Sequence, residues 1–126
     1  MLMMPIERRW FLMSINGIKK EEYRDIKPYW TKRFSKQIGF DLELLFKQND
    51  FEIAKQFLNN YPHREFIVKY RNGYSANAPY FIVRVQLCIG KGHKRWGAGE
   101  NETYILKYLD IIEIGNWEGL KNGKIN

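Results

Sequence analysis

The chain of 126 residues is poor in the residues that build disulfide scaffolds and metal centres. Cys88 is the only cysteine, and His63 and His93 are the only histidines, so no disulfide framework and no zinc-binding spacing exists. No apolar run approaches the ~20 residues of a transmembrane helix. The short apolar start leads at once into Glu7, Arg8 and Arg9, so no signal peptide is expected. These absences favour a cytoplasmic protein with no metal, no other cofactor and no membrane partner.

The residues that are present suffice for one folded domain. Hydrophobic residues make up 44% of the chain and aromatic residues 16%, which excludes disorder along its whole length. Neither a repeat nor a Pro- or Ser-rich linker divides the sequence. We therefore expect a single domain covering residues 1–126.

Positive charge is concentrated in the middle of the chain. The net charge is +7, and no Asp or Glu occurs from Phe66 to Gly99, where six Lys and Arg residues lie. Together with the aromatic content this predicts a nucleic-acid partner, because Lys and Arg neutralise phosphates while aromatic rings stack on bases. The alternative is a solvated basic surface that only maintains solubility.

Helical periodicity dominates the first half of the sequence and strand periodicity the second. Helices are expected at 5–16 and 28–38, ended by Gly17 and Gly39, and one or two more at 40–60, with Asp50 as an N-cap. Strands are expected at 18–24, 65–71, 79–90 and 103–114, with a tight turn at Asn72-Gly73, a glycine-rich loop at 90–99 and a tail at 116–126 anchored by Trp117 and Leu120. This order predicts an α+β protein, a small and mostly antiparallel β-barrel with helices covering its mouth.

Three motifs in the same order resemble a known family. The first is Gly17-x-Lys19-Lys20-x-Glu22-Tyr23-Arg24 followed by Pro28-Tyr29-Trp30-x-x-Arg33, and the others are Arg71-Asn72-Gly73-Tyr74 and the loop from Gly90 to Ala98. Over about residues 6–38 and 65–114 the chain resembles the ASCH domain of the PUA-like superfamily, in the form found in phages and bacterial genomes. The resemblance implies a PUA-like β-barrel, and residues 39–64 are then a helical insertion.

The first motif also supplies candidate site residues. Glu22 and Arg24 share one face of the expected strand, and a carboxylate held by Arg stays ionised and accepts from an amide or amino edge. The Arg24 fork can hold a phosphate or a base edge. We expect Lys19 at the rim of the same cleft, where its loss would not affect folding, and we expect Lys20 and Glu21 to face solvent. The alternative is an ion pair that only braces the mouth of the barrel.

Aromatic and basic side chains complete the candidate site. Tyr29, Trp30 and Tyr74 are possible stacking platforms, although Trp30 could equally be core, and Trp96 is a candidate lid or stacking ring. Trp10 and Phe11 are assigned to the core, Cys88 to a buried position and His93 to the surface. Phosphate contacts are expected from the glycine-rich loop. The full set of candidate ligand-binding residues is Lys19, Glu22, Arg24, Tyr29, Trp30, Arg33, Arg71, Tyr74, Lys91, Lys94, Arg95 and Trp96.

The resemblance implies RNA binding, with two enzyme activities as alternatives. Some ASCH proteins are amidohydrolases that remove the acetyl group from N4-acetylcytidine, and others are ribonucleases of single-stranded RNA. Lys19 matches the lysine of the amidohydrolases, but Glu22 replaces their threonine, so Glu22 would have to activate a water instead. We expect binding of RNA, a modified nucleoside or another nucleobase-containing ligand in a basic, aromatic-lined cleft. The alternatives are a hydrolase with Lys19 and Glu22 as catalytic residues, and a protein-interaction module with an exposed apolar patch.

Overall fold

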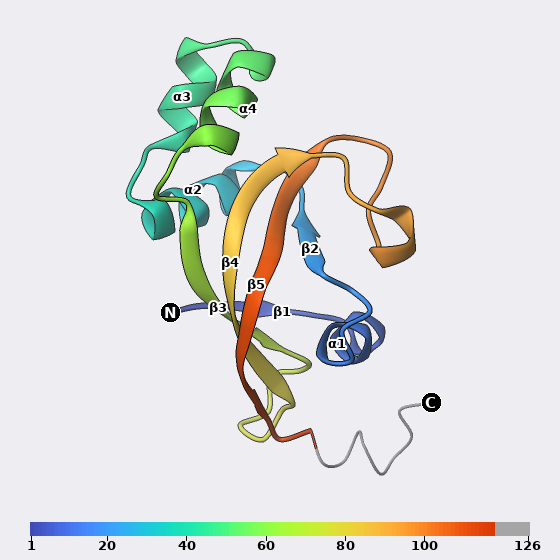
Figure 1. Ribbon diagram of the computed structural model, residues 1–126. Coiled ribbons are helices and arrows are strands. Elements are labelled where there is room, and N and C mark those ends of the chain that lie inside the picture. Colours follow the sequence, from blue (N-terminus) through green and yellow to red (C-terminus); the bar gives the residue numbers. More distant parts are fainter. Residues whose placement is uncertain (118–126) are drawn as a thin grey trace.

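The computed structural model describes residues 1–117 as an α+β fold (Figure 1). Its elements in chain order are β1 (Leu2–Pro5), α1 (Arg8–Ile15), β2 (Glu21–Arg24), α2 (Pro28–Ile38), α3 (Leu42–Gln48), α4 (Phe51–Asn60), β3 (Glu65–Arg71), β4 (Tyr80–Gly90), the 3-10 turn η1 (Lys94–Trp96) and β5 (Thr103–Gly115). None of the helices within residues 1–117 has the length and apolar character needed to cross a lipid bilayer.

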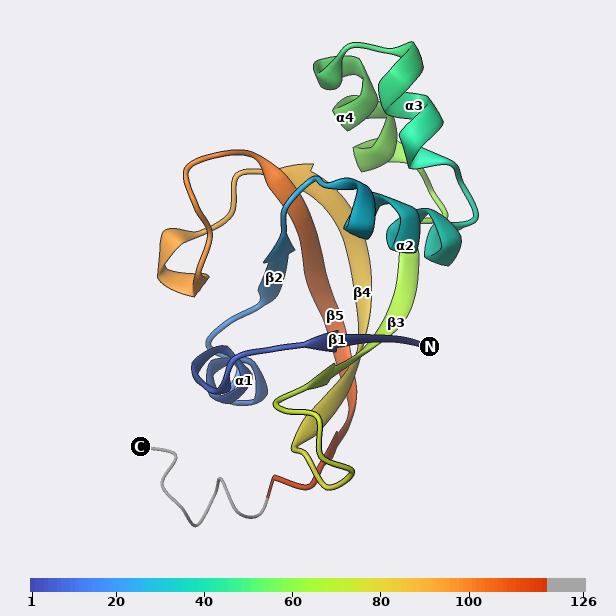
Figure 2. The same cartoon turned by 180° about the vertical axis from the view of Figure 1, so that it is seen from behind.

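The five strands form one curled sheet in the order β1-β3-β4-β5-β2. β1 runs parallel to β3, and the other three pairings are antiparallel, so the expected mostly antiparallel sheet is confirmed. Because β1 and β2 are the two edges, the sheet is a half-barrel that stays open between them. Figure 2 shows β1 crossing in front of the long strands as the sheet curls.

The first residues of the chain differ from the expectation of a helix starting at Pro5. Residues 2–5 pair with β3 as a strand, and the Ile6 amide then donates to the Arg71 carbonyl at 3.0 Å, so α1 begins only at Arg8. The next strand is shorter than the expected 18–24. Gly17 has φ 75°, and the amides of Ile18 and Lys19 both donate to the Met13 carbonyl, so these residues end α1 before β2 starts.

Most other boundaries agree with the sequence analysis. α2 and β3 have the expected bounds, and the segment 40–60 forms two helices, the second capped by Asp50 Oδ1 on the Ile53 amide at 2.9 Å. The prediction of a tight turn at Asn72-Gly73 is wrong, because a longer loop of residues 72–79 joins β3 and β4. The Asn72 side chain donates to the Ile6 carbonyl. Of the two expected tail anchors, Leu120 lies outside the described residues.

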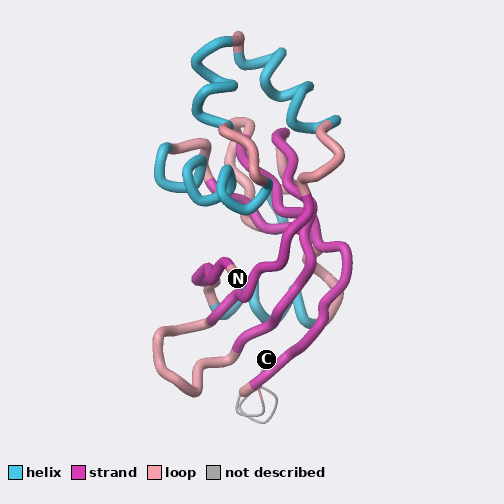
Figure 3. Tube along the Cα trace, turned by 90° about the vertical axis from the view of Figure 1, so that its left-hand side faces the viewer, coloured by secondary structure: helices cyan, strands magenta, loops and turns pink. Residues whose placement is uncertain are grey.

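The core lies on the concave side of the sheet. Phe11 of α1 packs edge-on against Phe81 of β4 with ring centroids 5.5 Å apart, and Phe34 of α2 packs against Tyr104 of β5 at 5.0 Å. Cys88 is half-buried, not in the core, because the alternation of β4 turns its neighbours Leu87 and Ile89 inward. Figure 3 shows α2, α3 and α4 gathered at one end of the sheet.

Asn59 fastens α4 to the end of β4. Its side-chain amide donates to the Ile89 carbonyl at 2.9 Å, and its Oδ1 accepts from the Ile89 amide at 2.8 Å. The Asn59 side chain therefore pairs with Ile89 as a residue of a neighbouring strand would. It satisfies the backbone amide and carbonyl of Ile89, which is buried. The helical segment 39–64 is joined to the sheet by directed hydrogen bonds as well as by apolar contact.

We predict that Asn59→Ala lowers the free energy of unfolding by about 2 kcal/mol, because it leaves two backbone groups of Ile89 unpaired. Asn60→Ala is the matched control. Asn60 is the next residue of the same helix, is exposed and bonds only the Gln56 carbonyl, so the change should stay within about 0.5 kcal/mol. Chemical denaturation of both variants measures the difference, and equal effects would contradict the anchoring role.

Candidate functional site

A cleft of about 520 Å³ lies where the half-barrel is open between its two edge strands. β1 and α1 contribute one side, β2 the other, and the β3–β4 loop and the turn after η1 close the ends. The residues that line this cleft are Pro5, Ile6, Glu7, Trp10, Glu22, Tyr23, Arg24, Gly73, Tyr74 and Gly97.

Lys19 lies beneath the cleft and not at its rim. Its side chain is only 1% exposed, its ammonium donates to the Trp96 carbonyl, and Nζ lies 3.3 Å from Glu22 Oε1. The centroids of the Trp10 and Tyr23 rings are each 4.8 Å from Nζ. Burial lowers the pKa of the Lys19 ammonium below its ordinary value, while the Glu22 carboxylate opposes this shift. The expectation of a rim lysine without a structural role is wrong.

Glu22 lines the cleft with a carboxylate that is held in place through one of its oxygens. Within residues 1–117, its contacts with Lys19 Nζ, the Tyr23 amide (3.1 Å) and Arg24 Nη1 (3.7 Å) all use Oε1. Glu22 lines the cleft, and Oε2 is not among the buried oxygens that lack a partner. Oε2 is therefore an available acceptor that the other contacts of the same carboxylate hold in place.

Arg24 closes part of the gap between the sheet edges. Nη1 donates to the Tyr23 carbonyl at 2.7 Å, and Nη2 donates to the Pro5 carbonyl of β1 at 2.6 Å. The guanidinium also lies 5.3 Å from the centroid of the Trp30 ring. Two of its donors are used by backbone carbonyls, so Arg24 braces the opening and contributes its charge to the cleft.

A second cluster ties β2 to the glycine-rich loop. The Tyr23 hydroxyl donates to Glu21 Oε1 at 2.8 Å and accepts from the His93 amide at 2.9 Å. We expected Glu21 to face solvent, but it is buried. Lys20 and the His93 side chain are exposed, as we expected. Burial raises the pKa of the Tyr23 phenol. A Cβ on Gly92 would lie 2.3 Å from the Tyr23 ring, so this close approach requires glycine.

The predicted aromatic residues are placed in three different environments. Trp96 is buried, so it is no lid, and it contributes its carbonyl to Lys19. Tyr74 is 87% exposed at the edge of the cleft. Trp30 is half-buried on Phe34, with centroids 5.7 Å apart, and exposed Tyr29 carries the Arg33 guanidinium 3.4 Å from its ring centroid. Tyr29, Trp30 and Arg33 of α2 do not line the cleft. Trp30 contacts a residue that does, because the Arg24 guanidinium lies over its ring.

None of the basic residues of the middle segment lines the cleft. Lys94 pairs with Glu100, Arg71 Nη2 donates to the Ser75 carbonyl at 2.9 Å, and Arg95 lies 4.9 Å from the centroid of the Trp96 ring. Lys91 is exposed. The positive charge at the cleft itself comes from Arg24 and, beneath it, from Lys19.

Trp10, which we expected in the core, packs against the core and also lines the cleft. It is half-buried, the Arg9 guanidinium lies 4.4 Å from its ring centroid, and a Cβ on Gly97 would lie 3.0 Å from the ring. Consecutive helical residues point about 100° apart, so Trp10 and Phe11 face different sides of α1. Phe11 is fully buried and Trp10 only half-buried. Tyr23 was missed as well, because its strand was expected to present only alternate side chains to the cleft.

Two tyrosines lie behind Glu22 in the core. The Tyr108 hydroxyl bonds Ser14 Oγ at 2.9 Å, but the buried Tyr70 hydroxyl has no hydrogen-bond partner among the described residues. Burial raises the pKa of both phenols, and the negative charge of Glu22 adds to the shift in each case. No group of three or more His, Cys, Asp and Glu side chains within residues 1–117 could hold a metal ion.

We predict that Lys19→Ala lowers the free energy of unfolding by about 3 kcal/mol, because it leaves a largely buried carboxylate without the nearer of its two cationic partners. Lys20→Ala is the control, since Lys20 is the next residue, is exposed and should change stability by at most about 0.5 kcal/mol. Thermal and denaturant unfolding measure both. A Lys19→Ala variant as stable as the parent would show that Nζ has no structural role.

We also predict that Tyr70→Phe leaves stability unchanged or raises it by about 1 kcal/mol, because the variant no longer buries an unpaired hydroxyl. Tyr104→Phe should instead lower stability by about 1 kcal/mol, since the Tyr104 hydroxyl bonds Thr31 Oγ1 at 2.6 Å. Both tyrosines are fully buried, so the comparison isolates the hydrogen bond. A loss at Tyr70 equal to that at Tyr104 would contradict the assignment.

Comparison with known proteins adds no assignment to this geometry. No family model matches the chain, and no curated protein or solved structure is significantly similar to it. The resemblance of its motifs to the ASCH domain therefore stays a prediction.

Proposed function

We propose that the protein binds single-stranded RNA, or another ligand that contains a nucleobase, with one base in the cleft. The observation that carries this proposal is the Glu22 carboxylate, which lines the cleft and whose Oε1 is held by Lys19 and Arg24. An ionised acceptor in a fixed position suits the amino or imino hydrogen of a base edge.

The walls of the cleft support the same ligand class. Trp10, Tyr23 and Tyr74 line it, and its volume of about 520 Å³ falls in the range of small-molecule sites. Stacking of a base on an aromatic ring contributes about 1–3 kcal/mol and tolerates any base. Tyr74, which is largely exposed, is available to cover a base once it has entered.

Charge and fold are consistent with a nucleic-acid ligand. Arg24 lines the cleft together with the carboxylates Glu7 and Glu22, so the lining is not basic as expected. The positive charge that would attract a phosphate comes from the chain as a whole, whose net charge is +7. The curled, mostly antiparallel sheet with helices is compatible with the PUA-like barrel that the ASCH resemblance implies, and membership of that family is part of the proposal.

One observation favours hydrolysis as a second candidate function. Lys19 and Glu22 are adjacent at a cleft, and burial lowers the pKa of the lysine. Because Lys19 Nζ is enclosed and bonded to the Trp96 carbonyl, Glu22 would have to act on a water with Oε2, and Lys19 would hold the carboxylate in position. Incubation with N4-acetylcytidine and with single-stranded RNA tests this activity.

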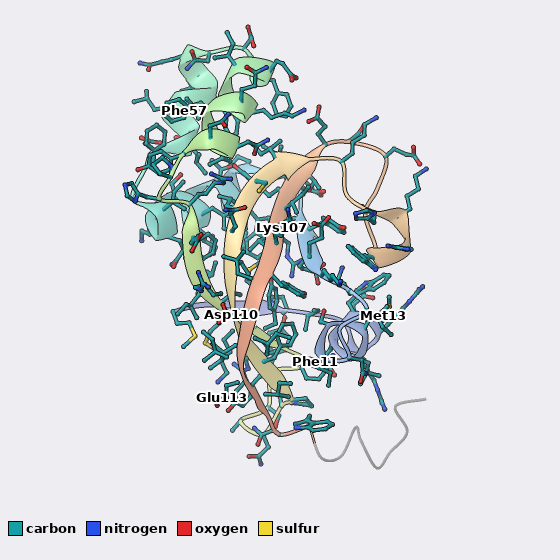
Figure 4. All side chains as sticks on the ribbon, in the orientation of Figure 1. Phe11, Met13, Phe57, Lys107, Asp110 and Glu113 are labelled. Carbon is teal, nitrogen blue, oxygen red and sulfur yellow. The ribbon has the colours of Figure 1, made fainter. Side chains whose placement is uncertain are left out.

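The feature expected of a protein-interaction module occurs in another part of the molecule. Leu44, Phe51, Ile53 and Phe57 of α3 and α4 are exposed. Figure 4 shows Phe57 in these helices, far from α1 and the cleft. Such a surface would not compete with a ligand in the cleft.

We predict that Glu22→Gln weakens binding of a mixed single-stranded RNA pool about tenfold, because a neutral amide accepts a weaker hydrogen bond than a carboxylate. Filter retention at low salt measures affinity, and thermal unfolding checks that the variant is folded. Glu43→Gln is the matched control, because Glu43 is an exposed carboxylate on α3.

Two other outcomes would change the conclusion. If the parent protein retains no RNA at low salt, the proposed binding function is overturned. If Glu22→Gln binds RNA or N4-acetylcytidine as well as the parent does but abolishes its turnover, Glu22 is a general base and the protein is a hydrolase.

A further inference from the structure

A second depression, which we call the notch, lies beside the cleft. It has a volume of about 340 Å³ and is lined by Met13, Gly17, Ile18, Lys20, Arg95 and Trp96. In Figure 4, Met13 lies on the side of α1 that faces the turn of residues 94–96. None of the six residues lines the cleft, so the notch is a separate site.

The cleft and the notch share one wall. Trp10 lines the cleft, and Met13, almost one turn further along α1, lines the notch. Gly97 lines the cleft, and its neighbours Arg95 and Trp96 line the notch. The wall is fixed where the Trp10 ring contacts Gly97 and where the Lys19 ammonium bonds the Trp96 carbonyl. The two depressions are therefore neighbours.

The notch combines apolar and cationic surface. Ile18 is 57% exposed and lies with Met13 on one part of the lining. Lys20 and Arg95 are both exposed, and neither forms an ion pair within residues 1–117, whereas Lys94 beside them is neutralised by Glu100. Apolar surface next to two unneutralised cations suits a group that has a flat or apolar part and an anionic part.

Positive charge continues across the wall between the two depressions. The Arg9 guanidinium lies 4.4 Å from the centroid of the Trp10 ring, and the Lys19 ammonium lies 4.8 Å from it. Arg9, like Lys20 and Arg95, has no carboxylate partner among the described residues. The exposed cations Arg9, Lys20 and Arg95 therefore follow the wall from Trp10 to the notch, whereas Lys19 is buried beneath it and Arg24 shares the cleft with Glu7 and Glu22. Exposed cations in such a row suit a phosphate backbone.

We propose that the notch is a second nucleotide subsite. Lys20 and Arg95 hold the phosphate that follows the base in the cleft, and Ile18 with Met13 supports the ribose or base of the neighbouring nucleotide. This inference rests on the proposed function, and it specifies the ligand as an unpaired strand of at least two nucleotides. Lys20, which the sequence analysis left without a role, becomes a binding residue together with Arg95.

Titration with the four ribonucleosides and their homodinucleotides, such as uridine and UpU, followed by tryptophan fluorescence, tests the subsite. We expect a dinucleotide to bind about tenfold more tightly than its nucleoside. In the double variant Lys20→Gln, Arg95→Gln this advantage should fall below about twofold with nucleoside binding unchanged, and dinucleotide binding should become less sensitive to salt. The control Lys32→Gln, Lys36→Gln removes two exposed α2 lysines, neither of which lines the cleft or the notch, and should keep the advantage.

The possible failures are distinguishable. If the parent protein binds no nucleoside, no dinucleotide and no RNA, the proposed function itself is overturned. If nucleosides bind but dinucleotides bind no more tightly, or if the Lys20→Gln, Arg95→Gln variant keeps the full advantage, the cleft still binds a base and only the second subsite is wrong. Equal losses in the two double variants would indicate a general effect of net charge, which also contradicts the subsite.

Discussion

The buried ammonium of Lys19 is the interaction on which the arrangement of the cleft depends. It joins the Trp96 carbonyl to the Glu22 carboxylate, and it lies between the Trp10 and Tyr23 rings. Three separate parts of the chain, α1, β2 and the 94–97 turn, therefore meet at the charge of Lys19. A buried cation requires partners on every side, and this requirement fixes those parts relative to one another.

The opening of the half-barrel has a related cause. β1 and β2 are edge strands that do not pair with each other, so their exposed backbone groups need other partners. Arg24 supplies them in part by donating to the Pro5 carbonyl of β1 from the end of β2. A side chain that spans the gap leaves space beside it, whereas a continuous hydrogen-bond ladder would close the barrel. The cleft between Trp10, Glu22 and Tyr74 occupies that space.

Local signals in the sequence were reliable where the local backbone decides the structure. Gly17 and Gly39 end helices with φ of 75° and 67°, and Asp50 caps α4 through its own side chain. The alternation of β3 predicts its bounds without error. The same reasoning failed for residues 2–5 and for Asn72-Gly73, because β1 exists only through pairing with β3, and the Asn72 side chain is used to hold the Ile6 carbonyl. Long-range pairing overrides local preference at both places.

For the candidate site, local sequence was enough to predict that Lys19, Glu22 and Arg24 come together, because a glycine that ends a helix directly before a short strand keeps them within a few residues. The excess of positive charge also follows from the sequence alone. Long-range packing, in contrast, buries Lys19, makes Trp10 and Tyr23 the walls of the cleft, and brings the Trp96 carbonyl, not its ring, to the site. The reason is that burial depends on which distant segments pack around a residue. Lys19 bonds the Trp96 carbonyl of the 94–97 turn, 77 positions further along the chain. The residues next to Lys19 in the sequence do not indicate that contact.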